Sequence, residues 1–190
     1  KRSAGPNGYG PTEFVIEGAN NDESKRFTGT LSVTNADADD DGTFESKKVY
    51  FILNNQYAAQ NALVSIDHGS VQFQLGVENV DIAGLSGAAT RASINRASNN
   101  SSPSTLNITY NGTSALTFAG SIGEGVSISK LGTGTQIFTG DMTAFNGTWT
   151  AGQGILDISS AGNVGTAATS YKLAGGTLQV GTINLGSGSQ

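Results

Sequence analysis

The acidic segment 35–45, NADADDDGTFE, holds the residues with the clearest potential for chemistry. In it, alternate aspartates precede a glycine and then a glutamate: Asp37, Asp39, Asp41, Gly42 and Glu45. This order matches the opening of a calcium loop, in which alternate carboxylates face one hard cation and glycine allows the sharp turn. An EF-hand needs a glutamate at loop position twelve, where this chain has Lys48, so Glu45 or the Thr43 carbonyl would have to contribute instead. Calcium binding and a solvated acidic loop are both open interpretations.

The single histidine, His68, follows Asp67 and lies close to Ser65. These are the residue types of a Ser-His-Asp triad. In such a triad the side chains converge from separate parts of a fold, whereas adjacent residues on a strand point to opposite faces. Since Gly69 follows, we expect His68 to be a turn residue.

Glycoside hydrolysis would need two carboxyl groups facing each other across a groove at about 5–9 Å. The candidate members are spread along the chain, and no motif pairs any two of them: Glu13, Glu17, Glu78, Asp81, Glu124, Asp141 and Asp157. We therefore expect no catalytic residues, no enzymatic activity, and no cofactor other than possible calcium.

Exposed aromatic rings could instead form a platform for sugars. The candidates are Trp149, Phe145, Tyr171, Tyr110, Tyr57 and Tyr50. Trp149 in FNGTWTA (145–151) occupies the position that Leu31 has in FTGTLSV (27–33). This correspondence favours a core position for Trp149 over a sugar-binding one.

The amino-acid composition limits the kinds of partner and site that we expect for this chain. Charged residues make up 13% of the chain and the net charge is −5, so contact with water must depend mostly on Ser, Thr, Asn and Gln. Basic residues form no stripe of the kind that nucleic-acid binders carry, and we expect no nucleic-acid partner. The absence of cysteine excludes disulfides and thiolate metal sites. No run of about 18 apolar residues is present, so no membrane insertion by this segment is expected.

Alternation of apolar and polar residues predicts many short strands. They are expected at 14–17, 28–34, 48–53, 63–67, 70–75, 79–82, 106–110, 115–118, 125–131, 135–139, 147–151, 154–158, 171–173, 176–180 and 182–185. Nearly every gap contains Gly, Asn or Asp, which tolerate positive φ in tight turns. Only 54–62 is weakly helical, so the sequence predicts an all-β chain.

Internal echoes indicate repeated units. FTGTLSV resembles FNGTWTA, and downstream of each, GSVQFQLG (69–76) matches GGTLQVG (175–181). The distance in sequence from the first segment to its downstream partner is longer in the first copy by about the length of the acidic segment. We predict a tail or cap at 1–26 and a β-solenoid at 27–190, with two related units at about 27–80 and 116–185 and an insertion at 35–45.

A parallel β-helix accounts for these features together. Strands of successive coils would stack at about 4.8 Å, with apolar rows inside and glycine or asparagine at the corners. With ~20–25 residues per coil, the chain would supply about seven or eight coils. The alternative is a β-sandwich, which shares the short strands and the glycine-rich turns.

Residues 116–158 resemble the autotransporter-associated β-strand repeat of bacterial surface proteins. The core of that repeat corresponds to Lys130-Leu131-Gly132-Thr133-Gly134-Thr135, and the later steps to Thr139-Gly140, Phe145-Asn146-Gly147 and Gly176-Thr177-Leu178. The segment 80–112 is similar to the one that often precedes this core. In this chain Gly154-Ile155-Leu156 stands where Gly-Thr-Leu is usual, and the acidic insertion is not part of the repeat. The resemblance implies a right-handed parallel β-helix that serves as a passenger or stalk at the cell surface.

Three functions follow as expectations. The first is a non-catalytic structural or adhesive segment of an exported bacterial surface protein, extracellular or on the cell surface, within a larger parent chain. Its partner would be a host or environmental glycan or protein. The alternative, tied to the sandwich fold, is a carbohydrate-binding module of a secreted glycoside-degrading protein. The third is a catalytic β-helix that degrades polysaccharides.

Overall fold

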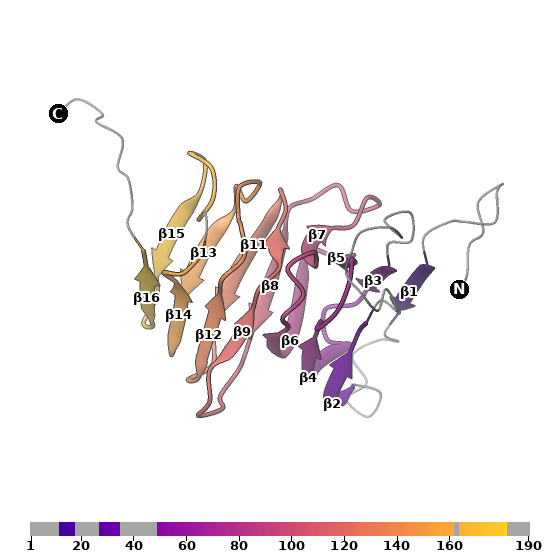
Figure 1. Cartoon of the computed structure of the whole chain (residues 1–190), viewed down its shortest axis with the longest axis horizontal. Coiled ribbons are helices and arrows are strands. Elements are labelled where there is room, and N and C mark those ends of the chain that lie inside the picture. Colours follow the sequence, from indigo (N-terminus) through magenta and orange to yellow (C-terminus); the bar gives the residue numbers. More distant parts are fainter. Residues whose placement is uncertain (1–11, 18–26, 35–48, 162–163, 182–190) are drawn as a thin grey trace.

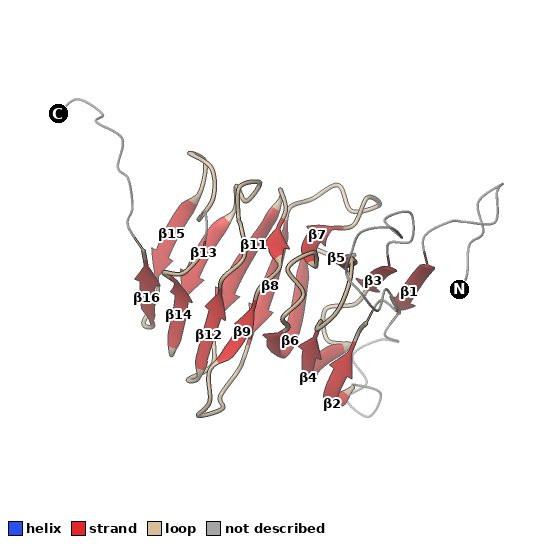
Figure 2. Cartoon of the chain, in the orientation of Figure 1, coloured by secondary structure: helices blue, strands red, loops and turns tan. Residues whose placement is uncertain are grey.

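The computed structural model describes residues 12–17, 27–34, 49–161 and 164–181. Within these ranges the regular structure consists of β-strands and contains no helix (Figures 1 and 2). In particular, none of the described residues forms a helix with the length and apolarity needed to cross a membrane. The prediction of an all-β chain is confirmed.

The strands form three parallel sheets. Sheet A has the order β1 (Thr12–Ile16), β3 (Val49–Leu53), β5 (Val71–Leu75), β7 (Ser93–Arg96) and β10 (Ser121–Ile122). Sheet B has the order β15 (Ser170–Leu173), β13 (Thr148–Ala151), β11 (Val126–Lys130), β8 (Ser104–Ile108), β6 (Asn79–Ser86), β4 (Ala59–Ser65) and β2 (Thr28–Ser32). Sheet C has the order β16 (Thr177–Val180), β14 (Ile155–Ile158), β12 (Thr135–Phe138) and β9 (Leu116–Phe118).

The pairing defines a β-solenoid. Strands consecutive in the described chain lie in different sheets, and each strand pairs in parallel with a strand of the next coil. One row of register partners in sheet B contains Leu106, Ile128, Trp149 and Tyr171. Neighbours in this row are 21 or 22 residues apart, which is the length of one coil. The solenoid prediction is confirmed, and the β-sandwich alternative is wrong because the paired strands of the described ranges all run parallel to one another.

The stack has about six turns rather than seven or eight. One reason is that the first coil is long. From Thr28 to its register partner Asn61 the chain uses 33 residues, which include residues 35–48. Those residues, and with them the acidic insertion, lie outside the described part of the chain, as does the expected strand at 182–185.

The interior follows directly from the alternation of side chains along each strand. In β11, Val126 and Ile128 are fully buried, whereas Ser127 and Ser129 face outward and are half-buried. Because the strands are parallel and in register, like side chains stack from coil to coil. The ring centroids of Phe51 and Phe73 lie 5.2 Å apart. A thin interior of such rows needs few apolar residues.

The corners need glycine because successive coils approach closely there. A Cβ at Gly140 or Gly147 would overlap a backbone carbonyl of the preceding coil, that of Gly120 or Val126. Gly125 and Gly154 have positive φ values of 69° and 61°, which other residues rarely adopt. Asparagine joins corners in another way, since Asn146 Oδ1 accepts a hydrogen bond of 2.9 Å from the Gly125 amide one coil earlier.

Two local expectations differ from the structure. Residues 54–62 form a turn followed by the start of β4, not a helix, because Ala58, Ala59 and Ala62 are buried in the solenoid core. Strands β7 and β10 were not predicted, since Ile94 and Ile122 are the only aliphatic residues in them. Of the echoed segments, 27–33 and 145–151 both contribute to sheet B, whereas 69–76 and 175–181 contribute to sheets A and C.

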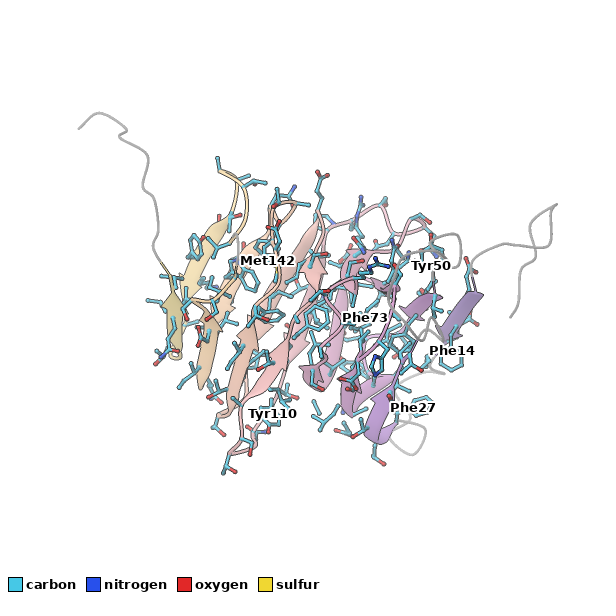
Figure 3. All side chains as sticks on the ribbon, in the orientation of Figure 1. Phe14, Phe27, Tyr50, Phe73, Tyr110 and Met142 are labelled. Atoms are coloured by element: carbon cyan, nitrogen blue, oxygen red, sulfur yellow. The ribbon has the colours of Figure 1, made fainter. Side chains whose placement is uncertain are left out.

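In the last described coil, the side chains that continue the buried row of β13 are exposed. Tyr171 and Leu173 are register partners of the buried Trp149 and Ala151, yet they are 41% and 69% exposed. At the other end of the stack, Phe14 of β1 and the nearby Phe27 are also exposed (Figure 3).

Candidate functional site

A polar groove lies at the corner between sheets A and B. Its volume is about 500 Å³. Three successive corners contribute to its lining, those between β3 and β4, between β5 and β6, and between β7 and β8. The lining residues are Asn54, Asn55, Gln56, Gly76, Val77, Glu78, Asn79 and Asn100. We call this site the corner groove.

Backbone hydrogen bonds fix the three corners against one another. The Gly76 amide donates to the Leu53 carbonyl at 2.9 Å, and the Ala97 amide donates to the Leu75 carbonyl at the same distance. Where the chain enters the next sheet, the Thr105 amide donates to the Glu78 carbonyl at 2.7 Å. The corner groove is therefore built on a backbone that is held from coil to coil.

Side-chain contacts orient part of the lining. Gln56 Nε2 donates to Asp81 Oδ2 at 3.2 Å, and Asn107 Nδ2 donates to Asp81 Oδ1 at 2.8 Å, so Asp81 positions Gln56 from outside the groove. Asn100 Oδ1 accepts from the Ser102 amide at 3.1 Å, and its Nδ2 donates to Ser104 Oγ at 2.9 Å.

A glycine makes room for one of the amides. A Cβ at Gly76 would come within 2.6 Å of Asn54 Oδ1. The absence of a side chain at Gly76 therefore lets the Asn54 amide lie over this corner.

Five of the eight lining residues have amide side chains, and one residue carries a charge. That one is Glu78, which is exposed. Among the described residues, no hydrogen bond or ion pair engages the carboxylate of Glu78 or the amide of Asn79. An amide offers both a donor and an acceptor, so the lining can hydrogen-bond groups that are donor and acceptor at once.

The predicted calcium ligands Asp37, Asp39, Asp41 and Glu45 lie outside the described residues. Within the described ranges no group of three or more His, Cys, Asp or Glu side chains could hold a metal ion.

The residues considered for a triad, Ser65, Asp67 and His68, lie in and next to the turn between β4 and β5. His68 lies in the bend between β4 and β5, before Gly69 with its φ of 73°, so the expected turn is confirmed. Ser65 Oγ donates to Asp67 Oδ2 at 2.7 Å and accepts from Ser86 Oγ at 3.2 Å, which links two coils. Ser65 thus bonds directly to the carboxylate, with no histidine between them.

Two of the candidate acids stabilise their own turns. Asp141 Oδ1 accepts from the amide and hydroxyl of Thr143, at 3.0 and 2.5 Å. Asp157 Oδ1 accepts in the same way from Ser159, at 2.8 and 2.6 Å. These are local turn contacts, and they do not bring the two acids together across a groove.

Trp149 is a core residue, as expected. It is fully buried, its ring lies 4.4 Å from Phe145 and 5.3 Å from Phe138, and its Nε1 donates to the Val164 carbonyl at 3.0 Å. Trp149 and Phe145 therefore present no face to a sugar.

The interior also holds a lysine. Lys130 is fully buried, and its Nζ donates to the Tyr110 carbonyl at 3.0 Å and to the Gly132 carbonyl. Burial lowers the pKa of Lys130 from 10.5 to about 8. The ammonium group ties one coil to the next at the corner between sheets B and C.

Sequence reasoning assigned no role to Lys130 and did not find the corner groove. For Lys130 a signal existed, because it continues the inward alternation of Val126 and Ile128. For the groove there was none, since residues about 22 positions apart come together only through the coil register.

No protein-family model, curated protein or solved structure matches this chain.

Proposed function

We propose that this chain is a non-catalytic structural and adhesive segment of an exported bacterial surface protein, similar to the passengers of autotransporters. Its role is to project side chains and loops from the cell on a stiff rod. The observation that carries the proposal is the unbroken stack of parallel strands, in which buried rows extend from Phe51 in the early coils to Ile158 in the late ones.

The corner after β11 supports the relationship to the repeat family. The Lys-x-Gly-x-Gly-Thr core begins at Lys130, which bonds carbonyls of two coils. A Cβ at Gly132 would overlap the Tyr110 carbonyl oxygen, and one at Gly134 would lie 2.6 Å from the Gly112 oxygen. Lys130, Gly132 and Gly134 thus each have a structural role in a coil corner.

The reactive side chains support a non-catalytic role. Ser65 bonds to Asp67, while Asp141 and Asp157 bond within their own turns. The carbohydrate-binding module was tied to a sandwich fold, which this chain does not have, and to exposed aromatic rings such as Trp149, which is buried.

Surface labelling tests the proposal. An epitope inserted between Ala167 and Ala168, in an exposed turn, leaves the strands intact. Intact cells that produce the full parent chain are expected to bind an antibody against the epitope without permeabilisation. An epitope placed on a cytoplasmic protein of the same cells is the control for leakage. Labelling only after permeabilisation would contradict a surface location.

A further inference from the structure

We propose that the corner groove binds a neutral saccharide of one or two rings. This inference rests on the adhesive role proposed above and names the class of ligand for that role. Of the residues that line the groove, Glu78 alone was a candidate from the sequence.

The volume fits a small polar ligand. At about 500 Å³ the groove lies within the ~300–1,000 Å³ of typical small-molecule sites. It is shallow and largely open to solvent, so a ring of a longer glycan could lie in it while the rest of the polymer extends outward.

The hydrogen-bonding chemistry fits vicinal hydroxyl groups. A sugar hydroxyl donates and accepts at the same time, and a side-chain amide does the same. Asn54 and Asn79 lie on successive corners, and the Glu78 carboxylate can accept from two adjacent hydroxyls.

The charge favours a neutral ligand. Glu78 is the only charged residue among those described in the lining, so this lining offers a carboxylate, sulfate or phosphate no positive partner. Arg96 lies nearby, where its Nη1 donates to the Asn100 carbonyl at 2.7 Å, so one of its N–H groups is already taken by the backbone of that corner.

A divalent cation fits less well. Calcium takes six to eight oxygen ligands, usually with several carboxylates. The corner groove has one carboxylate, and half of the polar atoms of its amides are nitrogen donors that repel a cation.

Rigidity lowers the cost of binding. Gln56 is held by Asp81, and Asn100 is held by Ser102 and Ser104. Side chains already fixed in place lose less conformational entropy when a ligand binds.

The test is a titration of the whole chain followed by the backbone amide signals in NMR. Cellobiose, lactose and N,N′-diacetylchitobiose are the neutral probes, and digalacturonic acid is the anionic one. At least one neutral disaccharide, at concentrations up to about 10 mM, is expected to shift the amides of residues 54–56, 76–79 and 100. Digalacturonic acid is expected to bind at least about fivefold more weakly.

Matched variants make the test specific. Asn79→Ala removes an exposed lining amide and is expected to weaken binding about fivefold, the effect of one lost hydrogen bond, whereas Asn61→Ala, an exposed asparagine on β4 outside the groove, leaves binding unchanged. Glu78→Gln is expected to bring the affinity for digalacturonic acid close to that for the neutral sugars. Glu124→Gln, at the corresponding corner between β10 and β11, is expected to change neither.

Two results would overturn the proposal. One is the absence of groove shifts with every neutral disaccharide. The other is that CaCl₂ alone shifts the groove amides while the sugars do not. Neither result would affect the proposed surface location, which cell labelling tests independently.

Discussion

At the scale of residues, several polar side chains buried in the described part of the solenoid bond to the backbone, among them Lys130 and Gln136. Lys130 Nζ bonds to carbonyls at the corner between sheets B and C. Gln136, also fully buried, donates to the Leu85 carbonyl at 2.9 Å and accepts from the Leu85 amide at 3.3 Å. A buried backbone group without a partner costs roughly 1–3 kcal/mol. Both side chains therefore stabilise positions where the ladder of strands is interrupted.

Lys130 makes the stability of the fold depend on pH. Below about pH 8 the lysine is protonated in the folded and the unfolded chain. Between pH 8 and 10.5 the unfolded chain keeps a proton that the folded chain has lost, so the free energy of unfolding rises with pH. In urea unfolding measured from pH 8 to 10.5, the free energy of unfolding of the natural chain is expected to rise relative to that of Lys130→Met.

The control for this experiment is Lys172→Met, which removes one positive charge at an exposed position of β15. The difference in free energy of unfolding between the natural chain and Lys172→Met should not rise between pH 8 and 10.5. A difference from Lys130→Met that stays flat or decreases above pH 8 would contradict the burial of a charged ammonium group.

Alternation along a strand predicts which way a side chain points but not what it meets. It correctly favoured the core for Trp149, through its correspondence with Leu31. It would also have placed Lys130 inside, yet the Tyr110 carbonyl that accepts its hydrogen bond belongs to another coil, 20 residues earlier. Such partners depend on the coil length, which the sequence gives only approximately.

At the scale of elements, the corners rather than the strands limit which sequences are tolerated. The strands need only alternate, whereas a corner must let two backbones approach. Gly147 is such a position, because a Cβ there would overlap the Val126 carbonyl oxygen. At Gly123, by contrast, the nearest atom to a new Cβ is Asn95 Oδ1, at the end of a side chain that can move.

We expect these two glycines to respond differently to alanine. Gly147→Ala forces the backbone of two coils apart and should lower the free energy of unfolding by about 1–3 kcal/mol, the typical cost of overpacking. Gly123→Ala should change it by at most about 0.5 kcal/mol. Denaturant unfolding of both variants measures the difference. Equal effects would mean that the corners are not close contacts between coils.

Element prediction succeeded where apolar residues alternate clearly, as in β5 and β11. It failed in β7 and β10, where Ile94 and Ile122 each stand alone among polar residues and pairing with neighbouring coils decides the structure. It also failed at 54–62, where small alanines that suit a helix are packed in a solenoid core. In each case the deciding interaction is with a residue in another coil.

At the scale of the whole molecule, stacking creates a surface that no single coil has. The corner groove combines side chains of three coils, and its residues are separated in sequence by about one coil length each. The same stacking leaves the row that contains Tyr171 and Leu173 open at one end. The rod, the groove and the open row therefore all depend on the coil register.

Cysteine pairs test that register directly, since the natural chain has no cysteine. Ser129 and Thr150 face outward on adjacent strands as register partners, 21 residues apart. Parallel neighbours about 4.8 Å apart lie within the Cα separation that a disulfide allows. The offset pair Ser127 and Thr150 is about 8 Å apart by the same strand geometry, beyond that range. On mild oxidation, the Ser129→Cys/Thr150→Cys variant is expected to form an intramolecular disulfide, whereas Ser127→Cys/Thr150→Cys should not. Equal crosslinking of both pairs, or of neither, would contradict the solenoid.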